Sequence, residues 1–386
     1  MVSKFKEVAA ILVISILPTL FLWIPFFFRL QSVWGIPIPQ NGMGTIVANY
    51  DGPLYLVVAK TLYNPDLLGN FEFGLPSSYY AAHFPLFPSL IRVFSSIFGF
   101  PYSMLFVTAV SSILAVYFFS QFIKDFVDKK HVLWITLVFA VFPARWLIVR
   151  SVGSAEPLFS AAIIASLYYF RKEKYFWAGI WGAIAQLTKS PAILLFLAYF
   201  LSLTLPRIKA AATINSPRLA ISFGLIKKYL LISLIPLALA GVFFLYKVRM
   251  SDFFAYFHSG DNIHLFFPPF QIFNYSQPWV GTFWLEEVIF VYLFGLLGLI
   301  KLIRMKENYL AWFVGLFFVS TLFVSHRDII RYSLPMVPFL FAAFSETITK
   351  KEFKLAMCIL IIPVYLFSLA YISQNVMPIS DWGPLL

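Results

Sequence analysis

The sequence predicts an all-α protein that crosses a membrane repeatedly, with about 11 transmembrane helices in a range of roughly 10–13. Hydrophobic residues make up 61% of the chain and charged residues only 12%, whereas a soluble domain has about 25% charged residues. The mean hydropathy is +0.84. Many apolar runs approach the roughly 20 residues that a helix needs to span a bilayer. Too few polar residues remain to cover a soluble core of this size, so a soluble globular protein is excluded.

Eleven apolar segments are candidate membrane helices. They cover residues 7–29, 103–123, 131–149, 157–170, 175–187, 190–205, 229–248, 288–303, 309–325, 333–347 and 355–373. Several are shorter than a perpendicular span requires. The first segment follows Lys4 and Lys6, and no small-residue cleavage site comes after it. We therefore expect a retained helix and not a signal peptide.

The net charge of +12 comes largely from basic loops between the apolar segments. Cytoplasmic loops of membrane proteins are enriched in Lys and Arg, so this charge indicates orientation and not a nucleic-acid partner. The loops expected in the cytoplasm run from Lys124 to Lys130, Arg171 to Lys174, Arg207 to Lys228, Lys301 to Lys306 and Lys350 to Lys354. Together with the lysines near the start of the chain, they predict a cell-membrane protein with a cytoplasmic N-terminus.

All of these loops can lie on the cytoplasmic side together with the N-terminus only if the segment 83–98 does not cross the membrane. It is apolar but short, contains prolines and has Arg92 in its middle. We expect it to lie on the membrane, or to dip into it, within the first external loop and without crossing. The alternative, a true span, would place either the N-terminus or the basic loop 206–228 outside.

The segments expected on the outer side are 30–102, 150–156, 249–287 and 326–332. They contain four of the five histidines, and a chain that gathers its titratable residues on one side has a working face there. We expect a single integral membrane domain, 1–386, with 30–102 and 249–287 as large external loops and 206–228 as a basic cytoplasmic loop. No internal repeat is evident, which weighs against an inverted-repeat transporter. The one cysteine, Cys358, excludes a disulfide within the chain.

Asp51 lies in the first external loop, in the sequence NYDGPLY. An aspartate before a first-turn proline such as Pro53 is typical of a helix N-cap. One interpretation is therefore that Asp51 only caps a helix over 53–63, which looks amphipathic and surface-lying. A carboxylate kept beside membrane-length apolar sequence usually has a function, because one drawn into hydrocarbon costs roughly 2.5–3.5 kcal/mol. Asp51 is thus a candidate catalytic base, flanked by Tyr50 and Tyr55 as candidate substrate contacts.

Three more charged residues are expected near the same membrane face. Glu156 begins the helix expected over 157–170, where a carboxylate meets the positive end of the helix, and a simple cap is the alternative. Arg145 lies inside an apolar run and needs an anionic partner, which a phosphate or a carboxylate supplies. Lys189 is a lone basic residue on the expected outer side, so it is also expected to contact an anion.

The turn SHRDIIRY contains His326, Arg327 and Arg331. The two arginines are four residues apart and would share one face of a helix. Paired guanidinium groups suit a phosphate. Binding of lipid headgroups at the membrane interface is the alternative interpretation.

The second large external loop contains His258, Asp261 and His264. Their spacing matches no recognised ligand pattern, so hydroxyl binding is favoured over a metal site. A divalent metal is compatible with the chemistry but is not indicated, and no other cofactor is expected. The sequence has no phosphate-binding glycine loop, dinucleotide motif, serine elbow or HExxH motif, so nothing supports ATP or redox chemistry.

Five stretches together resemble the GT-C superfamily of integral membrane glycosyltransferases. Within it, they are most similar to the GPI mannosyltransferase II type family and its prokaryotic relatives. They are YDGPLYLVVA, AHFPLFPSLIRVFSSIFG, FPARWLIVRSVGSAEPLFSAAI, GAIAQLTKSPAILLF and HRDIIRYSLPMVPF. They occur in the family's order, and FPLFP and SAEPLF are the more specific. The family often has a Ser-Glu-Ser-like turn where this chain has SAEP, and often has Arg where this chain has Lys189.

The resemblance implies a GT-C fold and an enzyme that transfers a sugar, expected to be mannose, from a polyprenyl- or dolichyl-phosphate donor in the membrane lipid. The acceptor would be a glycan, a glycolipid or a protein on the outer face. Inverting transfer needs one base for the acceptor hydroxyl and cations for the leaving phosphate. The expected roles are the base for Asp51, phosphate binding for His326, Arg327 and Arg331, and orientation of acceptor or base for His83 and Glu156.

Two other functions compete with this one. A transporter, flippase or lipid-linked glycan binding protein would perform no catalysis. A transporter should place charges at mid-membrane on broken helices, whereas this chain concentrates them at one surface. A ligase or polymerase of lipid-linked glycans would share the donor class.

Overall fold

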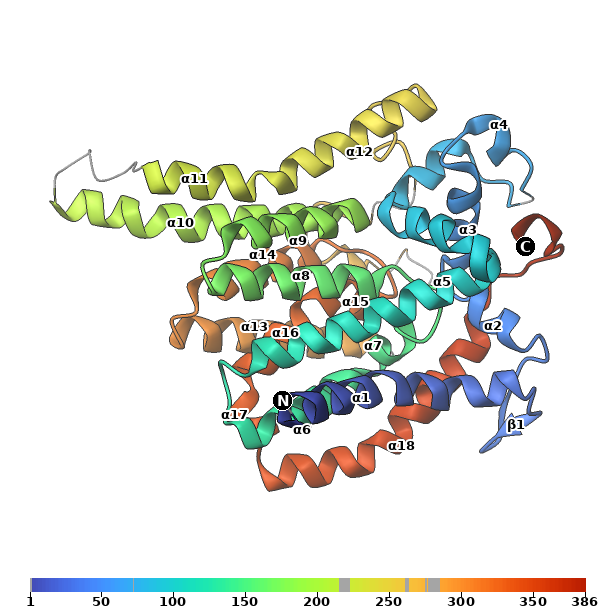
Figure 1. Cartoon of the computed structure of the whole chain (residues 1–386), viewed down its shortest axis with the longest axis horizontal. Helices are drawn as coiled ribbons and strands as arrows, with labels where there is room; N and C mark the ends of the chain where they lie inside the picture. Colours follow the sequence, from blue (N-terminus) through green and yellow to red (C-terminus); the bar gives the residue numbers. More distant parts are fainter. Residues whose placement is uncertain (1, 72, 215–222, 261–263, 275, 277–284) are drawn as a thin grey trace.

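The computed structural model describes residues 2–386 except 72, 215–222, 261–263, 275 and 277–284. Helices dominate this described part. Its one sheet is a two-stranded antiparallel ribbon of β1 (Ser32–Val33) and β2 (Ile36–Pro37). In Figure 1 the long helices run roughly parallel to one another, and the short helices of the first loop gather with the C-terminus beyond one end of them.

The longer helices are α1 (Val2–Phe27), α5 (Leu86–Ile123), α6 (Lys129–Val141), α8 (Glu156–Arg171), α9 (Tyr175–Thr188), α10 (Ile193–Ile214), α11 (Phe223–Ile232), α12 (Leu234–Met250), α13 (Glu286–Arg304), α14 (Asn308–Leu322) and α18 (Lys351–Gln374). The shorter ones are α2 (Met43–Val47), α3 (Gly52–Thr61), α4 (Pro65–Leu68), α7 (Ala144–Val149), α15 (Ile329–Ser333), α16 (Val337–Ala343) and α17 (Ser345–Ile348). The 3₁₀ turns are η1 (Ser77–Ala82), η2 (Ser190–Ala192), η5 (Gln271–Phe273), η7 (Leu334–Met336) and η8 (Gly383–Leu385).

Five helical stretches of the described chain are long and apolar enough to cross a membrane. They are Lys6–Phe27, Leu86–Ile123, Ser190–Ile208, Gly224–Met250 and Lys351–Gln374. The stretches Asn308–Leu322 and Ile329–Ala343 are apolar but shorter. Helices occur at all of the predicted segments, so the all-α, multi-pass architecture is confirmed. The number of spans, about 11, stays a prediction.

Three predicted helices are wrong in their continuity. Segment 229–248 is divided between α11 and α12 at Ser233. Segment 131–149 consists of α6 and α7, separated at Phe142 and Pro143. Segment 333–347 is divided among η7, α16 and α17. Proline has no N–H group to donate and disfavours a helical conformation in the residue before it. Pro143 therefore ends a helix that the apolar pattern alone would continue. The boundary between α16 and α17 lies at Phe344, where the sequence has no proline.

Residues 86–98 form the first part of α5, which is interrupted at Gly99, where φ is 72°. Only glycine adopts this conformation readily, so the interruption is encoded in the sequence. The part before Gly99 rises about 20 Å, less than the roughly 30 Å of bilayer hydrocarbon. The expected short helix is therefore present, and its path without crossing stays a prediction.

The helix predicted over 53–63 is α3, and its predicted place on the surface is wrong. Nine of its ten residues are buried. The run from Leu54 to Ala59 is apolar without a polar face, and such a helix is enclosed on all sides. Its neighbours include α5 and the C-terminal tail, where Lys60 donates a hydrogen bond to the carbonyl of Pro384 at 2.7 Å.

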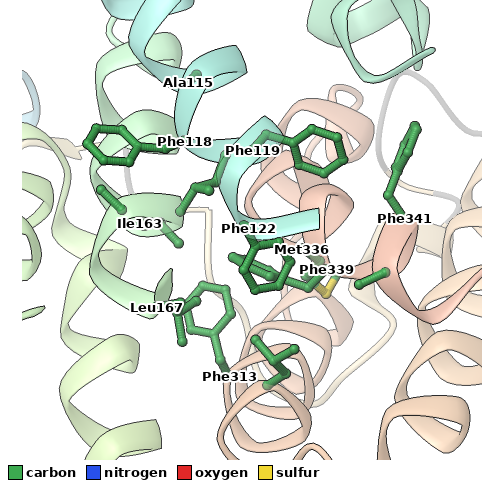
Figure 2. Packing of buried hydrophobic residues seen from close by; sticks show 14 of the residues in the cluster. Ala115, Phe118, Phe119, Phe122, Ile163, Leu167, Phe313, Met336, Phe339 and Phe341 are labelled. Atoms are coloured by element: carbon green, nitrogen blue, oxygen red, sulfur yellow. The ribbon is translucent and has the colours of Figure 1, made fainter. Parts of the chain in front are cut away.

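The largest apolar cluster lies among α5, α8, α14 and α16. Figure 2 shows side chains of α5, such as Phe119 and Phe122, between those of the other helices. The ring of Phe119 stacks on Phe139 of α6 at 4.0 Å. This packing fixes α8, whose first residue is Glu156 and whose last is Arg171. These two residues lie about 22 Å apart, at opposite ends of the helix.

Candidate active site

Asp51 occupies the N-cap position of α3, but its side chain makes no capping hydrogen bond, so that prediction is wrong. Its Oδ2 instead accepts a hydrogen bond from Nη2 of Arg331 at 3.0 Å, and 38% of the side chain is exposed. The chain is tightly folded here, because a Cβ on Gly52 would lie 2.3 Å from the carbonyl oxygen of Val47. Asp51 therefore lacks the hydrogen bond that a capping role requires, and its carboxylate stays accessible.

Glu156 is the first residue of α8, as predicted, and its side chain is only 6% exposed. Its Oε1 accepts hydrogen bonds from Nε of Arg331 and from Nζ of Lys189, both at 2.6 Å. The hydroxyl of Ser154 donates to its other oxygen. A buried carboxylate is costly unless it is paired and hydrogen-bonded, and here both oxygens are satisfied. The anion expected near Lys189 is therefore the side chain of Glu156.

Arg331 connects two segments of the chain that are distant in sequence. It projects from α15, and its guanidinium group binds Asp51 of the first loop and Glu156 of α8 through different nitrogens. The same group lies 4.5 Å from the centre of the Tyr50 ring, within cation–π range. One guanidinium fork thus fixes the distance between the two carboxylates and holds them on one side of the molecule.

A second ion pair lies next to the first. Nε of Arg145 is 3.0 Å from Oδ1 of Asp328, although these atoms are not aligned for a hydrogen bond. Arg145 also donates to the hydroxyl of Tyr50 at 3.1 Å and stacks on Tyr371 at 3.9 Å. The sequence indicated that Arg145 needs an anion but did not identify Asp328, which stands beside Arg327 in the same turn.

Tyr50 contacts both ion pairs, through its ring and through its hydroxyl. Its φ is 50°, in the left-handed region that costs an ordinary residue roughly 1–2 kcal/mol. The surrounding contacts hold the residue before Asp51 in this conformation. Strained backbone of this kind is often found at functional sites.

His83 and Tyr55 are both buried beside this region. Their rings meet edge to face at 4.9 Å. The backbone carbonyl of His83 accepts a hydrogen bond from Tyr63 at 2.6 Å, and its Nδ1 has no hydrogen-bond partner among the described residues. The structure therefore places the Tyr55 ring against other side chains, and leaves Nδ1 of His83 buried without a hydrogen-bond partner among the described residues.

The other predicted site residues do not all lie where the sequence predicted them. Arg327 is exposed in the turn before α15, so it does not share a helix face with Arg331. The rings of His264 and His326 lie 4.3 Å apart, and Nδ1 of His326 accepts from the backbone N–H of Asp328 at 3.0 Å. The structure thus brings His326 to the site through the turn that carries Asp328.

His258 pairs with Asp252 at 2.6 Å in an exposed part of the second loop. Asp261 lies outside the described residues. Within the described ranges no group of three or more His, Cys, Asp or Glu side chains is placed to hold a metal ion. His258 and His264 therefore belong to no such group among the described residues.

Opposite charges keep both site carboxylates ionised. Burial by itself would raise the pKa of Asp51, but the charges of Arg331 and His83 outweigh it and bring the pKa below its ordinary value of 3.8. Burial of Glu156 is likewise outweighed by Arg331 and Lys189, and its pKa falls below 4.5. Asp51 is therefore deprotonated at neutral pH, which is the state that a general base requires.

The fold is similar to the folds of known protein structures. No family model and no curated protein matches the sequence. The structure of ArnT from Cupriavidus metallidurans bound to undecaprenyl phosphate is similar with a TM-score of 0.54 and 14% identity, over 90% of this chain and 63% of that one. The Archaeoglobus fulgidus oligosaccharyltransferase in complex with Zn and sulfate is similar with a TM-score of 0.54 and 14% identity, over 96% of this chain and 54% of that one.

A second structure of the Archaeoglobus fulgidus oligosaccharyltransferase, tethered to an acceptor peptide containing the NVT sequon, has a TM-score of 0.51 and 13% identity. It covers 97% of this chain and 56% of that one. These similarities show that the chain has the GT-C fold. The chain spans between 54% and 63% of the lengths of these proteins. The closer resemblance to the GPI mannosyltransferase II type family stays a prediction.

Proposed function

We propose that this chain of GT-C fold is a membrane glycosyltransferase. It transfers a sugar from a polyprenyl- or dolichyl-phosphate donor to an acceptor hydroxyl at the outer membrane face, with inversion at the anomeric carbon. Mannose is the proposed sugar because of the sequence resemblance. The acceptor class is a glycan, a glycolipid or a protein. One similar structure is bound to undecaprenyl phosphate and another is tethered to an acceptor peptide, which is consistent with these two substrate classes.

The observation that carries this proposal is the state of Asp51. Its carboxylate is ionised and accessible, it does not cap its helix, and a guanidinium group holds it in place. A charged group beside membrane-length apolar sequence is expensive to keep unless it is used. A deprotonated carboxylate that can reach a substrate hydroxyl is what single-displacement transfer requires.

In the proposed reaction the acceptor oxygen attacks the anomeric carbon of the donor. Its proton passes to the carboxylate of Asp51, a new glycosidic bond forms, and the bond between the anomeric carbon and the phosphate oxygen breaks. The lipid phosphate leaves with the bonding electrons. No second carboxylate needs to react, so Glu156 is proposed to position Arg331 and Lys189 and not to exchange protons.

Cations must stabilise the charge that develops on the leaving phosphate. Arg331 and Lys189 converge on Glu156, and Arg331 also binds Asp51, so a phosphate group that reaches Glu156 would meet two positive side chains. Arg327, exposed in the neighbouring turn, is proposed as a further contact. His83, whose Nδ1 is buried without a described hydrogen-bond partner, is proposed to orient the acceptor hydroxyl.

The test incubates purified protein with a panel of radiolabelled polyprenyl-phosphate sugars and measures which donor is consumed. The Asp51→Asn protein should lose roughly 10²–10⁴ in transfer rate, the range for removal of a general base. It should keep its fold and its donor affinity, because Asn is nearly isosteric with Asp and the Asp51 side chain makes no capping hydrogen bond that would be lost. Asp66→Asn is the matched control, because Asp66 is exposed on α4.

Near-normal turnover of Asp51→Asn would overturn the assignment of the base, and Glu156 would be tested next. Binding of a donor without consumption of any donor, by the wild-type protein, would instead support a non-catalytic protein that binds lipid-linked glycans.

A further inference from the structure

The stretch 264–273 of the second large loop is closely attached to the end of α14. The N–H of Phe266 donates to the carbonyl of Phe323 at 2.9 Å, and the N–H of Phe270 donates to the carbonyl of Leu322 at 2.7 Å. Val324 forms a β-bridge with Leu265. The last carbonyls of a helix have no partner within the helix. Here the loop supplies these partners, and it is fixed to the helix end.

The same stretch has an inner and an outer side. Ile272 is fully buried in a small apolar cluster with Val288 of α13 and Ile329 of α15. Phe266 and Phe267, in contrast, are 46% and 87% exposed. In a loop that lies in water, exposed large apolar side chains are usually few and scattered. This loop instead has two adjacent exposed phenylalanines opposite its buried isoleucine.

The lengths of the adjacent helices indicate what covers these side chains. The turn between α13 and α14 contains Lys306 and Glu307, so it belongs at a membrane surface. From this turn, the 15 residues of α14 rise about 22 Å. Bilayer hydrocarbon is roughly 30 Å thick, and any tilt shortens the reach of the helix. The end of α14 that holds the loop therefore lies inside the hydrocarbon.

Helix α13, which the loop contacts, also has exposed apolar side chains. Phe290, Leu293 and Phe294 of that helix are 57%, 46% and 52% exposed. The ring of Phe270 meets Tyr292 of the same helix at 6.0 Å. Irregular backbone at membrane depth is tolerated only where its polar groups are satisfied within the protein. The hydrogen bonds to the end of α14 meet part of this requirement.

We propose that residues 264–273 form a membrane-inserted loop, with Phe266 and Phe267 in contact with bilayer hydrocarbon. The loop occupies the part of the bilayer thickness that α14 is too short to span. It also carries His264, whose ring lies against His326 beside the ion pairs. The proposal does not depend on the proposed function, because it concerns only the position of the loop relative to lipid.

The test measures collision of a spin label with oxygen, which concentrates in lipid, and with a water-soluble nickel chelate. The label is attached to Phe267→Cys in a Cys358→Ser protein reconstituted in lipid nanodiscs. Phe290→Cys on α13 is the lipid-exposed control, and Asp66→Cys on α4 is the water-exposed control. Position 267 should show the high oxygen and low nickel collision rates of position 290.

A nickel collision rate at 267 closer to that of position 66 than to that of position 290 would overturn the proposal. If Phe267→Cys does not fold, the label at Phe266→Cys gives the same comparison. Substitution with cysteine at either position leaves the ion pairs of the candidate site untouched, so the outcome is independent of whether the protein transfers a sugar.

Discussion

Arg331 makes two charged hydrogen bonds at once, and this geometry gives a sharp prediction. A lysine ammonium is a point charge and does not reproduce a planar fork that reaches both Asp51 and Glu156. Arg331→Lys should weaken donor binding about tenfold or more, on the roughly 1.5–3 kcal/mol scale of charged hydrogen bonds. Donor affinity is measured by titration in detergent. Arg327→Lys is the comparison, and unchanged affinity in both proteins would exclude the phosphate role.

His326 gives a prediction about stability and pH. Burial, with the charges of His264 and Arg331, lowers its pKa from 6.5 to about 4. The unfolded chain therefore takes up a proton on this residue at a higher pH than the folded chain does. The free energy of unfolding should fall as the pH is lowered from 6.5 toward 4, because the unfolded state binds more protons in that range.

The measurement is the melting temperature at several pH values for the wild type and for His326→Gln. The variant should lose less stability on acidification, since its side chain does not titrate. His131→Gln, on α6, is the control for the loss of an imidazole elsewhere in the chain. Identical pH profiles of the wild type and His326→Gln would contradict the prediction.

At the scale of residues, the sequence predicted the members of the site better than their contacts. Asp51, Glu156, Lys189 and Arg331 were all expected on one side, and the structure joins them in one hydrogen-bonded group. The pairing itself was not predictable, because the residues come from distant segments. Asp328 was missed for the same reason, since its partner lies in another helix.

At the scale of helices, glycines determine how closely two of them approach. Gly179 of α9 faces the neighbouring helix α11 so closely that a Cβ would lie 2.1 Å from the carbonyl oxygen of Leu231. Gly179→Ala must push backbone away from backbone, and overpacking of this kind costs roughly 1–3 kcal/mol. The expected result is a lower melting temperature in detergent.

Gly241 of α12 is the matched control, because an added Cβ there would meet no atom within 4 Å. Gly241→Ala should be neutral or should stabilise the protein by about 0.4–1 kcal/mol, through the lower entropy of the unfolded chain. Equal effects of the two substitutions would show that the close approach of α9 and α11 does not limit stability.

The apolar pattern located the helices but not their interruptions or their surroundings. Segment 131–149 is continuous in hydropathy, yet it breaks at Pro143, where the backbone chemistry overrides the pattern. The segments that bury α3 were also not predictable from its own sequence. Whether an apolar helix meets lipid, another helix or the C-terminal tail depends on segments that are far away in the chain.

At the scale of the whole molecule, charged groups separate into two sets at opposite ends of α8. One end has the network around Glu156. The other has Arg171, which pairs with Asp125 and Glu307. The set around Arg171 lies among the basic loops that the sequence predicts in the cytoplasm. The set around Glu156 lies among the segments that the sequence predicts on the outer side. The basic loops and the candidate site therefore lie toward opposite faces of one membrane.

The orientation follows from the positive-inside rule and is tested by labelling. Ser77 is exposed in the first loop, and Lys306 is exposed in the turn between α13 and α14. In a Cys358→Ser background, a membrane-impermeant maleimide added to intact cells should label Ser77→Cys and spare Lys306→Cys. Both should react after permeabilisation, which controls for accessibility. Labelling of position 306 but not of position 77 would place the candidate site in the cytoplasm, and the donor would then have to be presented from that side.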